Sequence, residues 1–116
     1  YLTEWVKFGD PGRVSIVNLE THAVTGSITT DFGAENIIEE NGKLYVSNTF
    51  ASTVSVIDPV LATVVKTIAV ESRPAGFVID KQNKLWVICG GDYGENNGNL
   101  VQIDLTTNEK IKTIIE

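Results

Sequence analysis

Short apolar runs alternate with polar turn residues along the whole chain, and this pattern predicts β-strands. In the middle of the chain the runs are Ala34–Ile38, Leu44–Asn48, Thr53–Asp58 and Thr63–Ala69. Turn formers such as Asn41-Gly42, which tolerate the positive φ of a tight hairpin, separate them. Val, Ile and Thr are frequent, and branching at Cβ favours strands over helices. We therefore predict an all-β fold with about eleven strands and no helix.

The same phrase occurs three times. Val14-Ser15-Ile16-Val17-Asn18 is followed by Val54-Ser55-Val56-Ile57-Asp58 after 40 residues and by Leu100-Val101-Gln102-Ile103-Asp104 after a further 46. Downstream, Gly26-Ser27-Ile28 aligns with Lys66-Thr67-Ile68 and with Lys112-Thr113-Ile114. An internal repeat of this length indicates stacked units of one supersecondary structure.

Each repeat is predicted to hold four strands. The inner strands are Ala34–Ile38 and Ala75–Ile79, and the second strands are Glu4–Phe8, Leu44–Asn48 and Leu85–Cys89. This alignment makes Trp5, Tyr45 and Trp86 equivalent, and we expect them to pack between repeats. The third strands are Arg13–Asn18, Thr53–Asp58 and Leu100–Asp104, and the fourth are Ala23–Thr29, Thr63–Ala69 and Glu109–Ile115. Four strands in roughly 42 residues is the periodicity of a β-propeller blade.

Several phrases resemble a known repeat family. Lys43-Leu44-Tyr45-Val46-Ser47-Asn48, Thr53–Pro59, Val64–Ile68 and Arg73–Asp80 resemble, in this order and spacing, the YVTN-type β-propeller repeat of YncE-like bacterial proteins. The phrase Asp80–Gly91 is similar to versions found in cell-envelope propellers of Bacteroidetes. The resemblance implies a cell-envelope location, in the periplasm or on the outer surface. Some relatives of this kind are surface lipoproteins that capture corrinoids for an outer-membrane transporter.

The chain is short for a closed propeller. Residues 1–29 supply a blade that lacks its inner strand, and residues 30–69 and 70–116 supply two whole blades, about 2.75 blades in all. Propellers close with about four to eight blades, and a blade buries its faces only against neighbours. We therefore expect either a fragment that needs its remaining blades or a chain that self-associates. The start at Tyr1, inside an expected strand, favours the fragment.

Charge and composition exclude several classes of partner. The net charge is −6 and the chain has no basic stripe, which argues against nucleic-acid binding. No apolar run is long enough to span a bilayer. Cys89 is the one cysteine, so no disulfide can form within the chain, and we expect a small buried side chain.

One loop is longer than its equivalents. In a propeller, the loops from outer to inner strand and from second to third strand lie on one face, and here that face includes Gly90–Asn99, which carries about six inserted residues. Asp92, Tyr93 and Asn96 within it are candidate ligand-binding residues. A solvated hairpin is the alternative. A calcium site at Asp92, Glu95 and Asn97 is disfavoured, because their spacing is not that of an EF-hand loop.

Three further candidates fall on the same face. Arg73 precedes Pro74 at the start of an inner strand, where it would contact an anionic ligand or a carbonyl or acid of the protein. Phe32 and Phe50 lie in loops and would belong either to a minor core or to a binding surface.

Catalytic and metal-binding patterns are not apparent in the sequence. His22 is the single histidine and falls in an expected exposed turn, far from the loop face. It has no second ligand at zinc spacing, and it lies too far from the loop face to act as the base that a serine nucleophile there would need. We therefore expect a non-catalytic module, without a cofactor, that binds a small molecule or an envelope partner. The alternative is a propeller-type enzyme whose catalytic residues lie in blades outside this chain.

Overall fold

The computed structural model describes residues 1–7, 9–92 and 97–115. All its regular elements are strands: β1 (Leu2–Glu4), β2 (Pro11–Val17), β3 (Val24–Phe32), β4 (Ala34–Glu40), β5 (Lys43–Asn48), β6 (Thr53–Asp58), β7 (Thr63–Ala69), β8 (Pro74–Ile79), β9 (Lys84–Cys89), β10 (Asn99–Asp104) and β11 (Glu109–Ile115). The all-β prediction is confirmed. Within these ranges no helix is long and apolar enough to cross a membrane.

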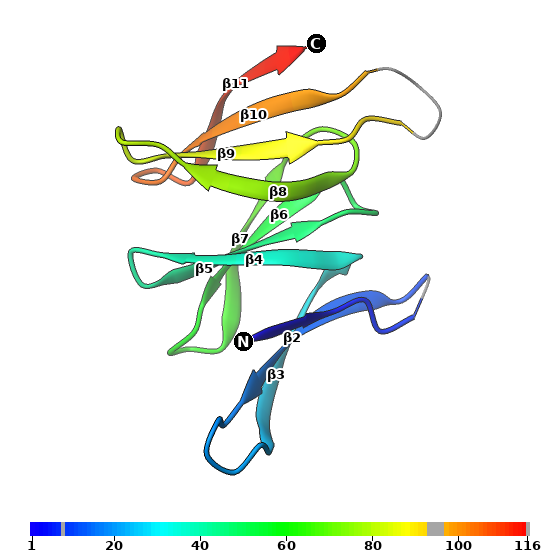
Figure 1. The fold of residues 1–116 in the computed structure, drawn as a ribbon, viewed down its shortest axis with the longest axis vertical. Helices are drawn as coiled ribbons and strands as arrows, with labels where there is room; N and C mark the ends of the chain where they lie inside the picture. The colour runs from blue at the N-terminus through cyan, green and yellow to red at the C-terminus, as the bar shows by residue number, and fades with distance from the viewer. Residues whose placement is uncertain (8, 93–96, 116) are drawn as a thin grey trace.

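The strands form three antiparallel sheets in chain order. We call them blade 1 (β1–β3), blade 2 (β4–β7) and blade 3 (β8–β11). Figure 1 shows the blades one above another in a curved stack, which measures 45 × 33 × 21 Å. Blades 2 and 3 have four strands and blade 1 has three, so the predicted arc of propeller blades is confirmed.

The first strand does not lie where the repeat alignment placed it. Leu2 is opposite Ser15 across the β1–β2 ladder, and Val46 is opposite Ser55 in blade 2, so Tyr1-Leu2 is the true equivalent of Tyr45-Val46. The predicted strand Glu4–Phe8 is therefore wrong at residues 5–7, while Phe8 lies outside the described residues, and the equivalence of Trp5 with Tyr45 is wrong as well. The chain turns after β1, with Val6 at φ 71° and the Lys7 amide donating to the Trp5 carbonyl. An aromatic residue followed by an aliphatic one occurs both at Tyr1-Leu2 and at Trp5-Val6, and the apolar pattern alone cannot choose between them.

A turn after each third strand explains why the repeated phrase ends in Asn or Asp. The side-chain oxygens of Asn18, Asp58 and Asp104 accept hydrogen bonds from the amides of Glu20, Val60 and Thr106, at 2.8, 2.9 and 2.8 Å. Each turn then ends in a residue with positive φ, at His22, Ala62 and Asn108. Such Asx turns let the chain reverse without leaving amides unpaired.

The core consists of two layers between blades. Val14 and Ile28 of blade 1 pack with Leu44, Val46 and Ile57 of blade 2. The larger layer joins blades 2 and 3 and contains Tyr45, Val54, Val56, Ile68, Leu85, Val87, Cys89, Val101 and Ile103. Because side chains alternate along a strand, blade 2 supplies both layers, one from each face. Each buried Val, Leu or Ile contributes about 1.5–3 kcal/mol.

Tyr45 confirms the expected packing between blades. Its ring is 1% exposed, and its hydroxyl donates a 2.6 Å hydrogen bond to Oδ1 of Asn108, in the β10–β11 turn of blade 3. Burial raises the pKa of this hydroxyl, as does the nearby charge of Glu40. Trp86 occupies the register-equivalent position in blade 3, because Trp86 is opposite Gln102 as Tyr45 is opposite Val56.

Candidate functional site

One edge of the arc collects the loops that were predicted to share a face. The β3–β4 link, the β5–β6 loop, the β7–β8 link and the described ends of the β1–β2 and β9–β10 loops all lie along the right-hand edge in Figure 1. We call this the loop edge. Those predicted ligand-binding residues that the structure describes lie on it in two groups, one at blades 1 and 2 and one at blade 3.

The first group forms an aromatic hollow. Trp5, Phe32 and Phe50 line it together with Lys7, Gly9, Asp10 and Gly33, and its volume is about 280 Å³. The rings of Trp5 and Phe50 meet edge to face, with centroids 4.8 Å apart and planes at 70°. Trp5, Phe32 and Phe50 are 46%, 40% and 47% exposed, so these rings line an open surface and not a core.

Backbone contacts fix the two phenylalanines relative to each other. The Phe50 amide donates to the Phe32 carbonyl at 3.2 Å, and the Thr49 amide donates to the Gly33 carbonyl at 2.9 Å. Gly33 has φ 76°, and a Cβ there would lie 2.7 Å from Cδ2 of Phe50. Glycine is therefore required both by the backbone conformation and by the approach of the ring.

The Asp31 side chain also holds the β3–β4 link in place. Its Oδ1 accepts from the Phe32 amide at 3.0 Å, and its Oδ2 accepts from the Thr53 hydroxyl at 3.0 Å. Phe32, at the end of β3, and Phe50, in the β5–β6 loop, are thus carried by backbone that is hydrogen-bonded between two blades. A hollow with such preformed walls can bind a flat apolar group without first ordering its own side chains.

The sequence predicted two of the three aromatic residues that line the hollow, Phe32 and Phe50, but not Trp5. Phe32 and Phe50 were predicted to share this face, and the structure brings them together. Trp5 and Lys7 were missed because residues 4–8 were assigned to a strand that packs between blades. The signal that could have placed them is Gly9-Asp10-Pro11, a turn sequence that begins four residues after Trp5.

The second group surrounds the base of the β9–β10 loop. The Gly90 and Gly91 amides donate to the carbonyls of Arg73 and Ser72 at 3.0 and 3.1 Å, and the Arg73 guanidinium donates to the Gly91 carbonyl at 3.5 Å. The Asp92 amide donates to Oδ1 of Asn97, whose Nδ2 donates back to Oδ2 of Asp92. The loop is closed at its base by these bonds.

The remaining candidates in this loop, Tyr93 and Asn96, lie outside the described residues, as does Glu95. In the described ranges, no three His, Cys, Asp or Glu side chains lie close enough together to hold a metal ion. Among the described candidates, Arg73 and Asp92 lie at blade 3, whereas Phe32 and Phe50 line the aromatic hollow at blades 1 and 2.

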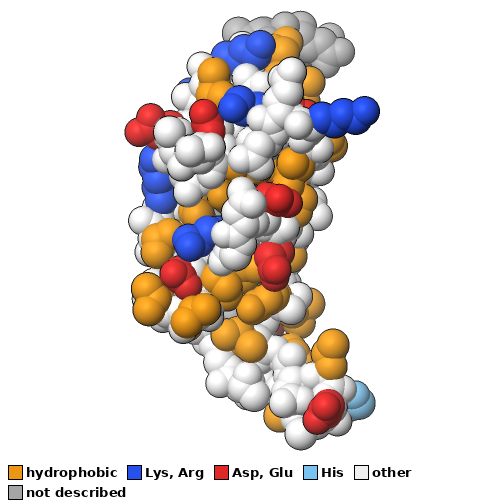
Figure 2. All heavy atoms as spheres, turned by 90° about the vertical axis from the view of Figure 1, so that its left-hand side faces the viewer, with side chains coloured by type: hydrophobic (Ala, Val, Ile, Leu, Met, Phe, Trp, Pro, Cys, Tyr) orange, Lys and Arg blue, Asp and Glu red, His pale blue; other side chains and the backbone are white. Residues whose placement is uncertain are grey.

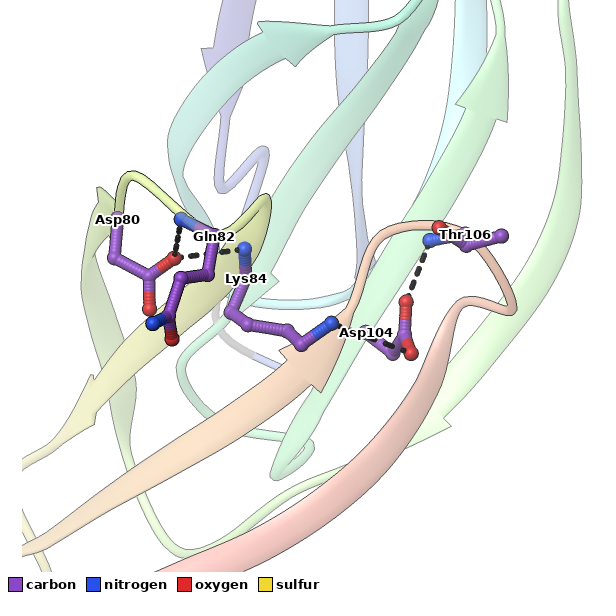
Figure 3. Close-up of polar contacts among 5 residues, drawn as sticks. All are labelled: Asp80, Gln82, Lys84, Asp104 and Thr106. Carbon is purple, nitrogen blue, oxygen red and sulfur yellow. Dashed lines mark hydrogen bonds and ion pairs between the residues drawn. The ribbon is translucent and has the colours of Figure 1, made fainter.

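The opposite edge carries the polar turns. In Figure 3, Oδ1 of Asp80 accepts from the amides of Gln82 and Lys84, and the Lys84 ammonium lies 3.5 Å from Asp104. A hydrogen bond from Trp86 Nε1 is the main cause that lowers the pKa of Asp80, and the Thr106 amide is the main cause at Asp104. Figure 2 shows acidic and basic side chains interspersed on this side. These carboxylates are bound within turns, which is a structural role.

His22 was expected in an exposed turn and Cys89 in a buried position, and both lie as expected. His22 is exposed in the β2–β3 turn. Cys89 is 1% exposed in the layer between blades 2 and 3, and burial raises the pKa of its thiol, which keeps it protonated and unreactive.

The sheets, their order and their stacking define this chain as an arc of β-propeller blades. Comparison with solved structures agrees. Kuenenia stuttgartiensis hydrazine synthase superposes with a TM-score of 0.77 at 27% identity, over 90% of this chain and 30% of that chain. The dihydro-heme d1 dehydrogenase NirN in complex with DHE superposes with a TM-score of 0.69 at 17% identity, over 90% of this chain and 23% of that chain.

The chain therefore spans less than a third of each of these two structures. No protein-family model and no curated protein matches the sequence. The likeness supports a propeller fold and does not extend to the YVTN-type, YncE-like group.

Proposed function

We propose that this arc is a non-catalytic binding module that presents its loop edge to a small-molecule ligand. The aromatic hollow carries the proposal. Three exposed aromatic rings converge on one hollow, whereas exposed apolar side chains on ordinary surfaces are scattered singly. Tryptophan and phenylalanine offer large contact areas with few rotatable bonds, which makes them efficient binding groups.

The size of the hollow and the residues that line it indicate which class of ligand it can bind. A hollow of about 280 Å³ accepts one flat apolar ring system. Lys7 and Asp10 also line it and bring one positive and one negative charge, so the hollow itself favours neither an anion nor a cation. A corrinoid, which the resemblance to envelope propellers suggests, is much larger and would contact the hollow only with one edge. The envelope location rests on that resemblance alone.

A fluorescence titration tests the proposal. In a Trp86→Phe background Trp5 is the single tryptophan, and energy transfer from it to N-phenyl-1-naphthylamine, a neutral flat probe, reports binding beside the hollow. We expect saturable transfer, and we expect Phe50→Ala to weaken it about tenfold, the effect of losing about 1.4 kcal/mol of contact.

Tyr1→Ala is the matched control, because Tyr1 is 54% exposed and does not line the hollow. It should leave the titration unchanged. Equilibrium dialysis with dicyanocobinamide examines the corrinoid version separately. Transfer that does not saturate, or that Phe50→Ala leaves intact, would reject the hollow as the binding site.

An enzymatic role is the alternative, and the names of both matched structures favour it. In that case residues outside this chain would complete the catalytic site. An enzyme of that kind would not need to bind a ligand in the hollow. A titration that shows no binding would therefore favour the enzymatic alternative.

A further inference from the structure

Two opposite charges come from a single turn beside the aromatic hollow. The Asp10 amide donates to the Lys7 carbonyl at 3.0 Å, which closes a turn between these two residues. Gly9, the third residue of the turn, has φ 91°, the positive value that this position of a type II turn requires. The Cα atoms at the two ends of a β-turn lie within about 7 Å of each other. Lys7 and Asp10 therefore bring a positive and a negative charge to one part of the lining of the hollow.

These two charges are not used by the fold. Both side chains are exposed, and no ion pair among the described residues includes Lys7 or Asp10. On the opposite edge, by contrast, the Lys84 ammonium lies 3.5 Å from the Asp104 carboxylate. Since Lys7 and Asp10 do not neutralise each other, each can meet a group of opposite charge on a ligand.

The acidic side chains on either side of the β3–β4 link are bound by the protein itself. Asp31 accepts hydrogen bonds on both carboxylate oxygens, from a backbone amide and from the Thr53 hydroxyl. Glu35 accepts a hydrogen bond from the Thr49 hydroxyl. These carboxylates hold strand ends and loops in place, so Asp10 is the acid of the hollow that can bind a positive charge on a ligand.

An apolar ring that carries one positive and one negative group matches this arrangement. We propose that the aromatic hollow binds an aromatic α-amino acid, with its ring among the three aromatic side chains, its carboxylate at Lys7 and its ammonium group at Asp10. The inference rests on the proposed binding function and names the ligand class for the same site. Both charged groups of such a ligand are attached to one carbon atom, which a single methylene joins to the ring. They therefore stay together at the exposed side of the hollow when the ring enters it.

Competition against N-phenyl-1-naphthylamine tests the proposal, in the Trp86→Phe background used for the titration. L-phenylalanine is compared with 3-phenylpropionate, which lacks the ammonium group, and with 2-phenylethylamine, which lacks the carboxylate. We expect phenylalanine to compete about three- to fivefold better than either, because this is the effect of one solvent-accessible ion pair. N-acetyl-L-phenylalaninamide, which carries neither charge, should compete least well.

Two variants assign the two charges. In Lys7→Gln, phenylalanine should lose its advantage over 2-phenylethylamine and keep its advantage over 3-phenylpropionate. In Asp10→Asn the reverse should hold. Lys81→Gln is the matched control, because Lys81 is an exposed lysine in the β8–β9 turn on the opposite edge; it should keep both advantages. Each inhibition constant is calculated with the probe affinity of the same variant, so that a change in probe binding does not enter the comparison.

The outcomes separate this inference from the function on which it rests. Saturable probe binding with equal competition by all four compounds would overturn the amino-acid proposal and leave the hollow as a site for uncharged rings. An advantage of phenylalanine that neither variant removes would also overturn it. Better competition by N-acetyl-L-phenylalaninamide than by phenylalanine would overturn it in favour of an aromatic side chain within a polypeptide. Absence of saturable probe binding would reject the hollow as a binding site, and the amino-acid proposal with it.

Discussion

Gly33 links the fold to the aromatic hollow at the scale of a single residue. We expect Gly33→Ala to lower the free energy of unfolding by about 2–4 kcal/mol, because a positive φ and a displaced Phe50 ring each carry a cost. Gly42→Ala is the matched control. Its φ of 75° nearly equals the 76° of Gly33, and a Cβ there would meet nothing within 4 Å. We expect it to cost only about 1 kcal/mol in urea titrations. Equal costs would contradict the close approach of Phe50.

Three carboxyl groups give a second prediction at this scale. The pKa values of Glu4, Asp80 and Asp104 are all lowered, mainly by hydrogen bonds from Ser15, Trp86 and the Thr106 amide respectively. A carboxyl group whose pKa is lower in the folded than in the unfolded chain stabilises the folded state. This contribution is fully present above the unfolded pKa, which is about 4, and it is lost as the pH falls through the folded pKa. We therefore expect the urea midpoint to fall below about pH 4.

The Trp86→Phe variant assigns part of this pH dependence. It removes the main cause of the lowered pKa of Asp80, so that pKa should rise toward the ordinary value in a carbon-13 NMR titration. Asp104 serves as the internal control, since Trp86 is not among the causes of its shift. An unmoved Asp80 would show that the turn amides of Gln82 and Lys84 suffice to hold the carboxylate.

At the scale of elements, the Tyr45–Asn108 contact joins blade 2 to blade 3. Tyr45→Phe should lower the free energy of unfolding by about 0.5–1.5 kcal/mol, the usual net value of one hydrogen bond. Asn108→Ala followed by Tyr45→Phe should cost no more than Asn108→Ala alone. A full additional loss in the double variant would show that the hydroxyl stabilises the fold through some other partner.

Most elements followed from the sequence because the repeat supplied them more than once. The ranges of β6, β7 and β11 were predicted as observed, since alternation, turn formers and the three aligned phrases agree there. β1 was misplaced because its blade lacks an inner strand, and Trp5-Val6 imitates Tyr45-Val46. The hollow could be predicted only in part for the same reason, since Trp5 reaches it through a turn that periodicity does not record.

At the scale of the whole molecule, the two core layers differ in size. Among the residues that the structure describes, the layer between blades 2 and 3 contains eleven buried residues, and the layer between blades 1 and 2 contains six. Stability in a repeat array is approximately a sum of units and interfaces, so blade 1, with three strands and the smaller interface, should open first. Hydrogen exchange followed by mass spectrometry should show less protection in β2 and β3 than in β6 and β10.

Two core truncations make this order of opening testable. Leu44 and Leu85 are 1% and 0% exposed, in the smaller and the larger layer respectively. Leu44→Ala should raise exchange in β2 and β3 while β9 and β10 stay protected. Leu85→Ala, with the same atoms removed, should instead raise exchange in blades 2 and 3, since it loosens the layer that holds them together. If either substitution raises exchange equally in all three blades, the arc unfolds as one cooperative unit, and the aromatic hollow between blades 1 and 2 is then as stable as the core.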